Sequence, residues 1–171
     1  MTNSAGHDGP VHPPGELAAQ IVSVLGERGQ TLATAESLTG GLLGAAITAV
    51  SGASLVYRGG VIAYATELKA ALLGVSEDLL ARHGPIHPGV SMAMATGARD
   101  RLGATWGLAT TGVAGPDPAD GFPPGTVHIA ASAGSPATRS LALAGDRDRI
   151  RRDTVDQALQ LLFELLREDA P

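Results

Sequence analysis

The stretch that decides the fold is TLATAESLTGGLLGAAITAV, residues 31–50. Its first part, TLATA, predicts a short buried strand, and its last part, which is apolar nearly all round, predicts a buried helix that begins just after Ser37. Between them lie an acidic residue, a serine and the glycines Gly40 and Gly41, which would let a ligand approach the backbone. A strand that passes into a helix is typical of α/β proteins, and these bind ligands at the carboxyl ends of their strands.

The flanking sequence continues the alternation of helices and strands. Residues 13–30 place Leu17, Ile21 and Leu25 at four-residue spacing, which predicts an amphipathic helix that closes near Gly29. Further helices are predicted at 66–72, 76–84, 87–103 and 148–168, and strands at 55–65 with a bulge at Gly59–Gly60, at 105–112, and as a hairpin at 126–132 and 137–143. We therefore predict a single three-layer α/β/α domain over residues 14–171, with helices covering a central mixed sheet, after a flexible tail at residues 1–13.

Composition and charge exclude several classes of function. The chain has 171 residues, 44% of them hydrophobic, a net charge of −5 and no cysteine. The absence of cysteine excludes thiol catalysis and disulfides, and the acidic balance argues against nucleic-acid binding. The first residues do not form a secretory signal, and the longest apolar stretch is shorter than the roughly 18 residues that a membrane span needs. We expect a cytoplasmic protein that binds neither membranes nor nucleic acid.

Ser37 has two interpretations. Serine is a preferred N-cap, and Thr39 would serve as well, so the residue can be purely structural. Alternatively, Ser37 is a nucleophile. Its hydroxyl would then point from the carboxyl end of the strand towards a ligand, and N–H groups at the start of the following helix would stabilise an oxyanion.

Lys69 is the only lysine among the 12 basic side chains of the chain. Arginine cannot lose its proton, whereas a desolvated lysine can become a neutral base, so this lysine is a candidate general base; the alternative is one surface lysine that remains by chance. Tyr64, five positions earlier, is a candidate proton relay or hydrogen-bond partner of the serine, or else a residue that simply packs at the end of a strand. Packing is the simpler interpretation for Tyr57.

Four arginines lie at positions 147, 149, 151 and 152. Arg147 and Arg151 are one helical turn apart and can clamp a phosphate, whereas Arg149 and Arg152 are expected to pair with nearby aspartates in solvent. The Gly/Pro-rich loop at 113–125 either offers N–H groups to an anion or is only a long turn. His83 and His87 are separated by Gly84 and Pro85, which break any helix that would align them, so we expect no metal site.

Several segments together resemble the C-terminal domain of the CinA family (competence/damage-inducible protein), the nicotinamide-nucleotide amidases, from about Glu16 to Glu168. They are TLATAESLTGGLLGAAIT, SGASLVYRGGVIAYATELKAALLGV, MAMATGARDRLGATWGLATTGVAGP, PPGTVHIA and GDRDRIRRDTVDQALQLL. The family hydrolyses the carboxamide of nicotinamide mononucleotide to give nicotinate mononucleotide and ammonia. The resemblance implies a catalytic set and a substrate-binding set. The catalytic set is Ser37, Tyr64 and Lys69, and the binding set is Thr39, Gly40, Gly41, Thr111, Gly112, Gly115, Arg147 and Arg151.

The chain departs from the family pattern in three places. Leu38 stands where cysteine is common, His87 stands where serine is usual and can alter the rim of the pocket, and the loop at 115–125 lacks the usual paired glycines. The N-terminal domain of longer members is absent, so we expect a stand-alone amidase that acts on a small-molecule nucleotide, needs no cofactor or metal, and forms a homo-oligomer. The alternatives are a non-catalytic nucleotide-binding regulatory module and a DNA-associated competence factor, the latter opposed by the charge.

Overall fold

The computed structural model describes residues 14–134 and 136–169. The tail predicted at residues 1–13 lies outside this part of the chain. The helices and strands, in chain order, are α1 (Pro14–Glu27), β1 (Leu32–Glu36), α2 (Leu42–Thr48), a 3₁₀ turn (Ala53–Leu55), β2 (Tyr57–Ile62), α3 (Thr66–Leu73), α4 (Glu77–His83), α5 (Pro88–Leu102), β3 (Trp106–Gly112), β4 (Thr126–Ser132), β5 (Ala137–Ala142) and α6 (Arg147–Glu168).

The strands form one mixed sheet in the order β2-β1-β3-β4-β5. β1 is parallel to both β2 and β3, whereas β4 is antiparallel to β3 and to β5, as the predicted hairpin requires. The pairing of β1 with β2 shifts register between Leu32 and Ala33, which lie opposite Tyr57 and Gly59. The irregularity therefore falls at Arg58, beside the predicted glycine bulge. β2 ends at Ile62, earlier than predicted, because the chain turns there towards α3.

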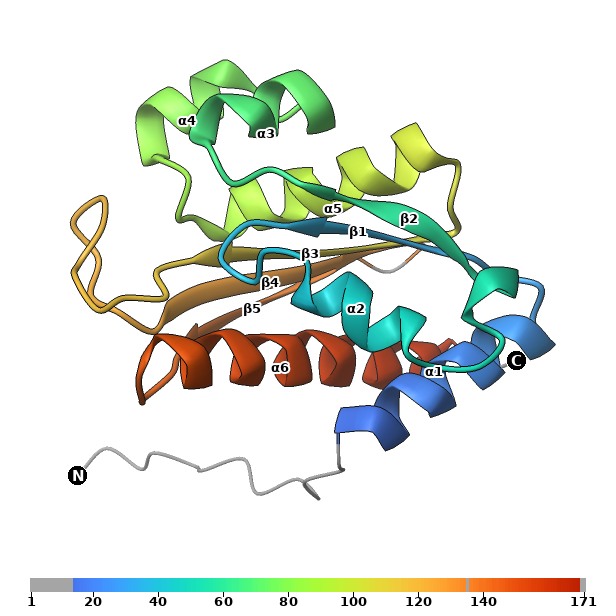
Figure 1. The fold of residues 1–171 in the computed structure, drawn as a ribbon. Coiled ribbons are helices and arrows are strands. Elements are labelled where there is room, and N and C mark those ends of the chain that lie inside the picture. Colours follow the sequence, from blue (N-terminus) through green and yellow to red (C-terminus); the bar gives the residue numbers. More distant parts are fainter. Residues whose placement is uncertain (1–13, 135, 170–171) are drawn as a thin grey trace.

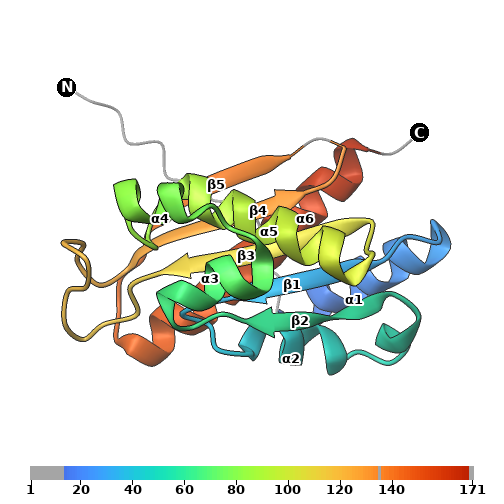
Figure 2. The same cartoon turned by 90° about the horizontal axis from the view of Figure 1, so that it is seen from above.

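The helices cover both faces of the sheet, so the predicted three-layer α/β/α architecture is confirmed (Figures 1 and 2). α1, α2 and α6 lie on one face, and α3, α4 and α5 lie on the other. The core between the sheet and α1, α2 and α6 contains the predicted apolar face of α1 together with Trp106 and Leu162. The core on the opposite face contains Val90, Met94 and Ala98 of α5. No helix in the described part of the chain is long and apolar enough to cross a membrane.

The start of α2 differs from the prediction. The helix begins at Leu42 instead of directly after Ser37, because Gly40 and Gly41 adopt positive φ angles of 57° and 104° and form a turn that no helix can include. Only Leu43 and Ile47 of α2 are buried. The pattern suggested a fully buried helix because alanine is compatible with either a buried or an exposed face. The extra turn leaves Ser37 outside the helix, at the end of β1.

Candidate active site

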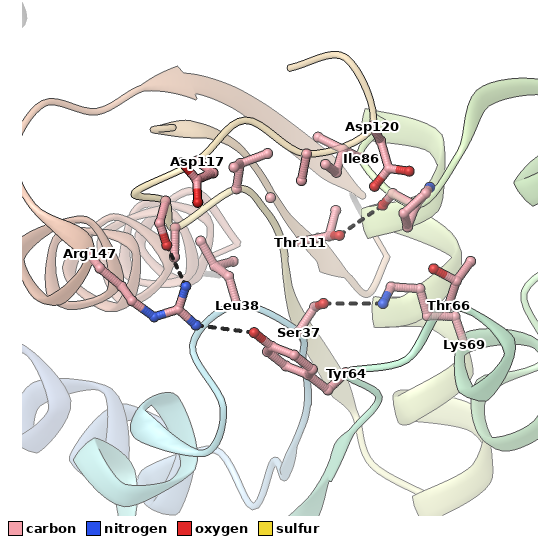
Figure 3. Close-up of a pocket in the computed structure, with 16 residues that line it drawn as sticks. Ser37, Leu38, Tyr64, Thr66, Lys69, Ile86, Thr111, Asp117, Asp120 and Arg147 are labelled. Atoms are coloured by element: carbon pink, nitrogen blue, oxygen red, sulfur yellow. Dashed lines mark hydrogen bonds between the residues drawn. The ribbon is translucent and has the colours of Figure 1, made fainter. Parts of the chain in front are cut away.

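A cavity of about 270 Å³ opens at the carboxyl ends of β1 and β3. Ser37 follows the last residue of β1, and its N–H donates to Thr110 O of β3 at 3.0 Å, so the backbone of the two strands fixes its position. The cavity is lined by residues from five separate segments, among them Ser37, Tyr64, Lys69, Thr111, Asp120 and Arg147 (Figure 3). The strand-to-helix junction singled out in the sequence thus forms one wall of a pocket.

Ser37 and Lys69 form a buried pair in this pocket. Lys69, on α3, is only 1% exposed, and its Nζ donates to Ser37 Oγ at 3.1 Å and to Ala63 O at 2.7 Å. Burial lowers the pKa of the Lys69 amine from 10.5 to about 8, although the charges of Asp120 and Glu67 oppose this shift. The amine is therefore neutral in a useful fraction of molecules near neutral pH. In that state its lone pair can accept the proton of the serine hydroxyl.

Neither Ser37 nor Thr39 caps α2. Glu36, the last residue of β1 and 2% exposed, accepts hydrogen bonds from the N–H groups of Gly41, Leu43 and Gly44 at 2.9, 3.0 and 2.9 Å. The capping interpretation of the serine is therefore wrong. This role of Glu36 was not predicted from the sequence, although an acidic side chain just before a helix is a recognisable signal because carboxylates are stabilised at helix N-termini.

Arg151 and Thr39 hold the backbone around the serine instead of lining the pocket. Arg151 donates through Nε to Leu38 O at 2.9 Å and through Nη2 to Thr39 O at 3.0 Å. The Thr39 hydroxyl is paired with that of Thr110 at 2.8 Å. The predicted clamp of Arg147 and Arg151 on one phosphate is not formed, because one helical turn along α6 brings Arg151 to the loop that follows Ser37. Gly40 and Gly41 belong to this loop and are likewise not among the lining residues.

Arg147 does line the pocket, on the side away from Lys69 (Figure 3). It donates to the carbonyl of Gly115 and, at 3.1 Å, to the hydroxyl of Tyr64, which is 60% exposed (Figure 3). Within the described residues Tyr64 makes no hydrogen bond to Ser37 or Lys69, whereas Lys69 contacts Ser37 directly. The neighbouring arginines behave as predicted: Arg149 and Arg152 are ion-paired on the surface of α6.

The loop between β3 and β4 forms another side of the pocket. Thr111, Gly112 and Gly115 line it as predicted, and the Thr111 hydroxyl donates to Pro85 O at 2.8 Å. Asp117 and Asp120 also line it. They were not predicted from the sequence, because their contribution depends on how this loop folds back.

His87 is not among the residues that line the pocket. Its Nδ1 accepts from Gly89 N at 3.1 Å and caps α5, while its ring stacks on that of His83 with 4.3 Å between centroids. His87 thus caps the start of α5, while Pro85 and Ile86 of the preceding turn line the cavity. Among the described residues no group of three or more histidine, aspartate or glutamate side chains is arranged to hold a metal ion.

The fold and the pocket together define a three-layer α/β protein with a buried serine–lysine pair at the carboxyl edge of its parallel strands. Residues 15–166 match the family model of the CinA C-terminal domain. The chain belongs to this family, as the sequence motifs predicted.

Relatives of known sequence and structure agree with this assignment. The chain is 52% identical over 151 residues to a CinA-like protein of Frankia casuarinae, a match that covers 88% of this chain and 35% of that protein. It thus spans about a third of the length of this curated relative. Crystal structures of CinA superfamily proteins from Klebsiella pneumoniae and Escherichia coli are 33% and 30% identical to the chain, with TM-scores of 0.88 and 0.89. These matches cover 92% and 96% of this chain and 99% of each solved chain.

Proposed function

We propose that this domain hydrolyses the carboxamide of nicotinamide mononucleotide, with Ser37 as nucleophile and Lys69 as general base. The observation that carries the proposal is the 3.1 Å hydrogen bond between the buried Lys69 amine and the Ser37 hydroxyl, combined with the lowered pKa of that amine. The choice of substrate rests on the resemblance of the motifs to those of the nicotinamide-nucleotide amidases. Membership of the CinA family supports it.

The proposed reaction proceeds in two halves. Neutral Lys69 takes the proton of Ser37 as Oγ attacks the amide carbon, and the resulting ammonium returns a proton to the leaving nitrogen, so that ammonia departs and an acyl-enzyme remains. Water then attacks the acyl-enzyme with Lys69 again as the base, which releases the carboxylate and restores the serine. Serine and lysine supply the whole acid–base chemistry of this scheme, so activity should survive dialysis against a metal chelator.

Arg147 is the group best placed to bind the phosphate of the substrate. It lies at the side of the pocket away from Lys69, and its guanidinium has donors beyond those directed at Gly115 and Tyr64 (Figure 3). A carboxamide at Ser37 would then leave the ribose between these two ends, beside the loop at 113–125. Arginine suits this task because its planar fork matches phosphate geometry.

The direct test is to incubate the purified protein with nicotinamide mononucleotide and to measure ammonia and nicotinate mononucleotide together. Equal amounts of both products are expected, and Ser37→Ala should abolish them while leaving substrate binding largely intact. Ser91→Ala is the matched control, because Ser91 is also buried but is not among the residues that line the pocket. Nucleotide binding without any turnover by the wild-type protein would contradict the proposal and would favour a regulatory binding module.

A further inference from the structure

We infer that the negatively charged oxygen formed when Ser37 attacks the amide is bound by the backbone N–H groups of Leu38 and Gly112, and not by the start of α2. This inference rests on the proposed function, since it concerns the tetrahedral intermediate of that reaction. In the step concerned, the Oγ–carbon bond forms, the serine proton moves to Lys69, and the π electrons of the carbonyl become a lone pair on its oxygen. That oxygen then needs hydrogen-bond donors.

The N-terminus of α2 would be the obvious source of such donors, but its N–H groups are occupied. Glu36 accepts from Gly41, Leu43 and Gly44. The remaining N–H of this turn, that of Leu42, donates to Thr39 O at 3.1 Å. The Glu36 carboxylate also places a negative charge against this helix end, which would oppose a second anion there. The donors must therefore come from another part of the pocket.

Gly112 offers one donor at the end of β3. Ser37 N donates to Thr110 O on the β1 side of that strand, and Val113 N donates to Thr126 O on the β4 side. Because backbone groups alternate in direction along a strand, the N–H of Gly112 faces the β1 side, one step beyond the point where Ser37 is paired. Gly112 lies opposite Val127 in a pair that does not exchange ladder bonds, and among the described turn and loop residues no bond from this N–H is present. It therefore faces the pocket beside the nucleophile with its donor available.

The glycine at position 112 is required for this arrangement. Its φ angle is 155°, and a Cβ atom built there would lie only 2.4 Å from Thr126 O and 2.8 Å from the Cα of Val127. Any side chain would thus push the end of β3 away from β4 and would displace the N–H of Gly112.

Leu38 offers the second donor, in the residue that directly follows the nucleophile. Its carbonyl is held by Arg151 Nε at 2.9 Å, and the carbonyl of Ser37 accepts from Gly40 N at 3.1 Å, so this peptide is fixed on both sides. Leu38 lines the pocket, and no hydrogen bond between described residues uses its N–H. An N–H that follows the nucleophile is the position from which other serine hydrolases bind their oxyanion.

The test is a backbone amide NMR titration of the ¹⁵N-labelled protein with 3-pyridylboronic acid. The boron accepts Ser37 Oγ and becomes tetrahedral, so that one of its oxygens takes the place of the oxyanion. We expect the amide protons of Leu38 and Gly112 to move downfield by about 0.5 ppm or more, as charge-assisted hydrogen bonds require. The amides of Gly41, Leu43 and Gly44, already bound to Glu36, should stay within the shifts seen for the rest of the chain.

Two controls distinguish shifts caused by hydrogen bonds to the boronate oxygen from shifts caused by the nearby ring. Pyridine, which lacks boron, reports the effect of the ring alone, and Ser37→Ala should remove the shifts caused by the boronate. If ¹¹B NMR shows a tetrahedral adduct on the wild-type protein while the Leu38 and Gly112 amide shifts stay unchanged, the inference is overturned. The same holds if the amide shifts of α2 change instead. In both cases Ser37 remains supported as the nucleophile. If the boron remains trigonal at saturating probe, the proposed nucleophile fails and the inference falls with it.

Discussion

The pKa of Lys69 should govern the pH dependence of the reaction. Burial lowers it from 10.5 to about 8. At pH 7 about a tenth of the molecules would then carry a neutral amine, compared with about 0.03% for a lysine of ordinary pKa, which is a gain of roughly 300-fold in competent base. We therefore expect kcat/KM to rise about tenfold per pH unit up to about pH 8 and to level off above it.

Two substitutions of Lys69 test the assignment. Lys69→Arg keeps the charge but cannot supply a neutral base, and Lys69→Met keeps the approximate length without a base, so both should lower kcat by roughly 10²–10⁴-fold. Thermal unfolding of each variant identifies any loss of folding. The midpoint near pH 8 should disappear from whatever rate remains.

Stability gives an independent check with a defined sign. The pKa of Lys69 is lower in the folded than in the unfolded chain, so the unfolded chain binds more protons between about pH 8 and 10.5. The free energy of unfolding should therefore contain a contribution that rises with pH across this window, and the full penalty of the buried charge should be present below about pH 8. Lys69→Met should lack that contribution. Urea unfolding of both proteins at several pH values measures it.

Because the chain contains one lysine, selective ¹³C labelling of lysine Cε reports its titration directly. A midpoint near 10.5, or a kcat/KM midpoint near pH 8 that persists in Lys69→Met, would refute the reasoning. In the first case the amine would not be desolvated in solution, and in the second another group would be the base.

Three further predictions concern the surroundings of the pair. Arg147→Met should raise KM for nicotinamide mononucleotide by roughly 10- to 100-fold, because a charge-assisted bond to phosphate is lost, and should leave KM for the dephosphorylated nucleoside nearly unchanged. Steady-state kinetics with both substrates measure this, and an equal rise of KM for both would mean that the arginine does not bind the phosphate. Tyr64→Phe should lower kcat by less than about tenfold, since the hydroxyl contacts Arg147 and not Ser37. A loss of roughly 10²-fold or more in kcat would instead support proton transfer through the tyrosine. Glu36→Gln should lower the free energy of unfolding by roughly 1–3 kcal/mol in urea titrations, because an amide group cannot accept all three N–H bonds, and an unchanged midpoint would contradict this account.

The sequence by itself indicated the elements, the layers and, as candidates, the serine and the lysine that the structure brings into contact. Hydrophobic periodicity is a local property, so the spacing of Leu17, Ile21 and Leu25 was sufficient to predict α1 and its buried face. Local chemistry made Ser37 and Lys69 candidates, because one is a serine at a strand end and the other is a lysine where every other Lys or Arg position is an arginine. The choice between their catalytic and structural interpretations came from the family resemblance.

Only the tertiary structure decided how the neighbouring side chains divide their tasks. The direction of a side chain depends on where its element begins, and α2 begins at Leu42 because two glycines form a turn before it. That turn placed Glu36 on the helix N–H groups and left the serine free to face Lys69, 32 residues further along the chain. In the same way Arg147 reached the pocket while Arg151 reached the loop behind it. Such contacts join segments that are distant in sequence, and residue spacing carries no information about how those segments meet.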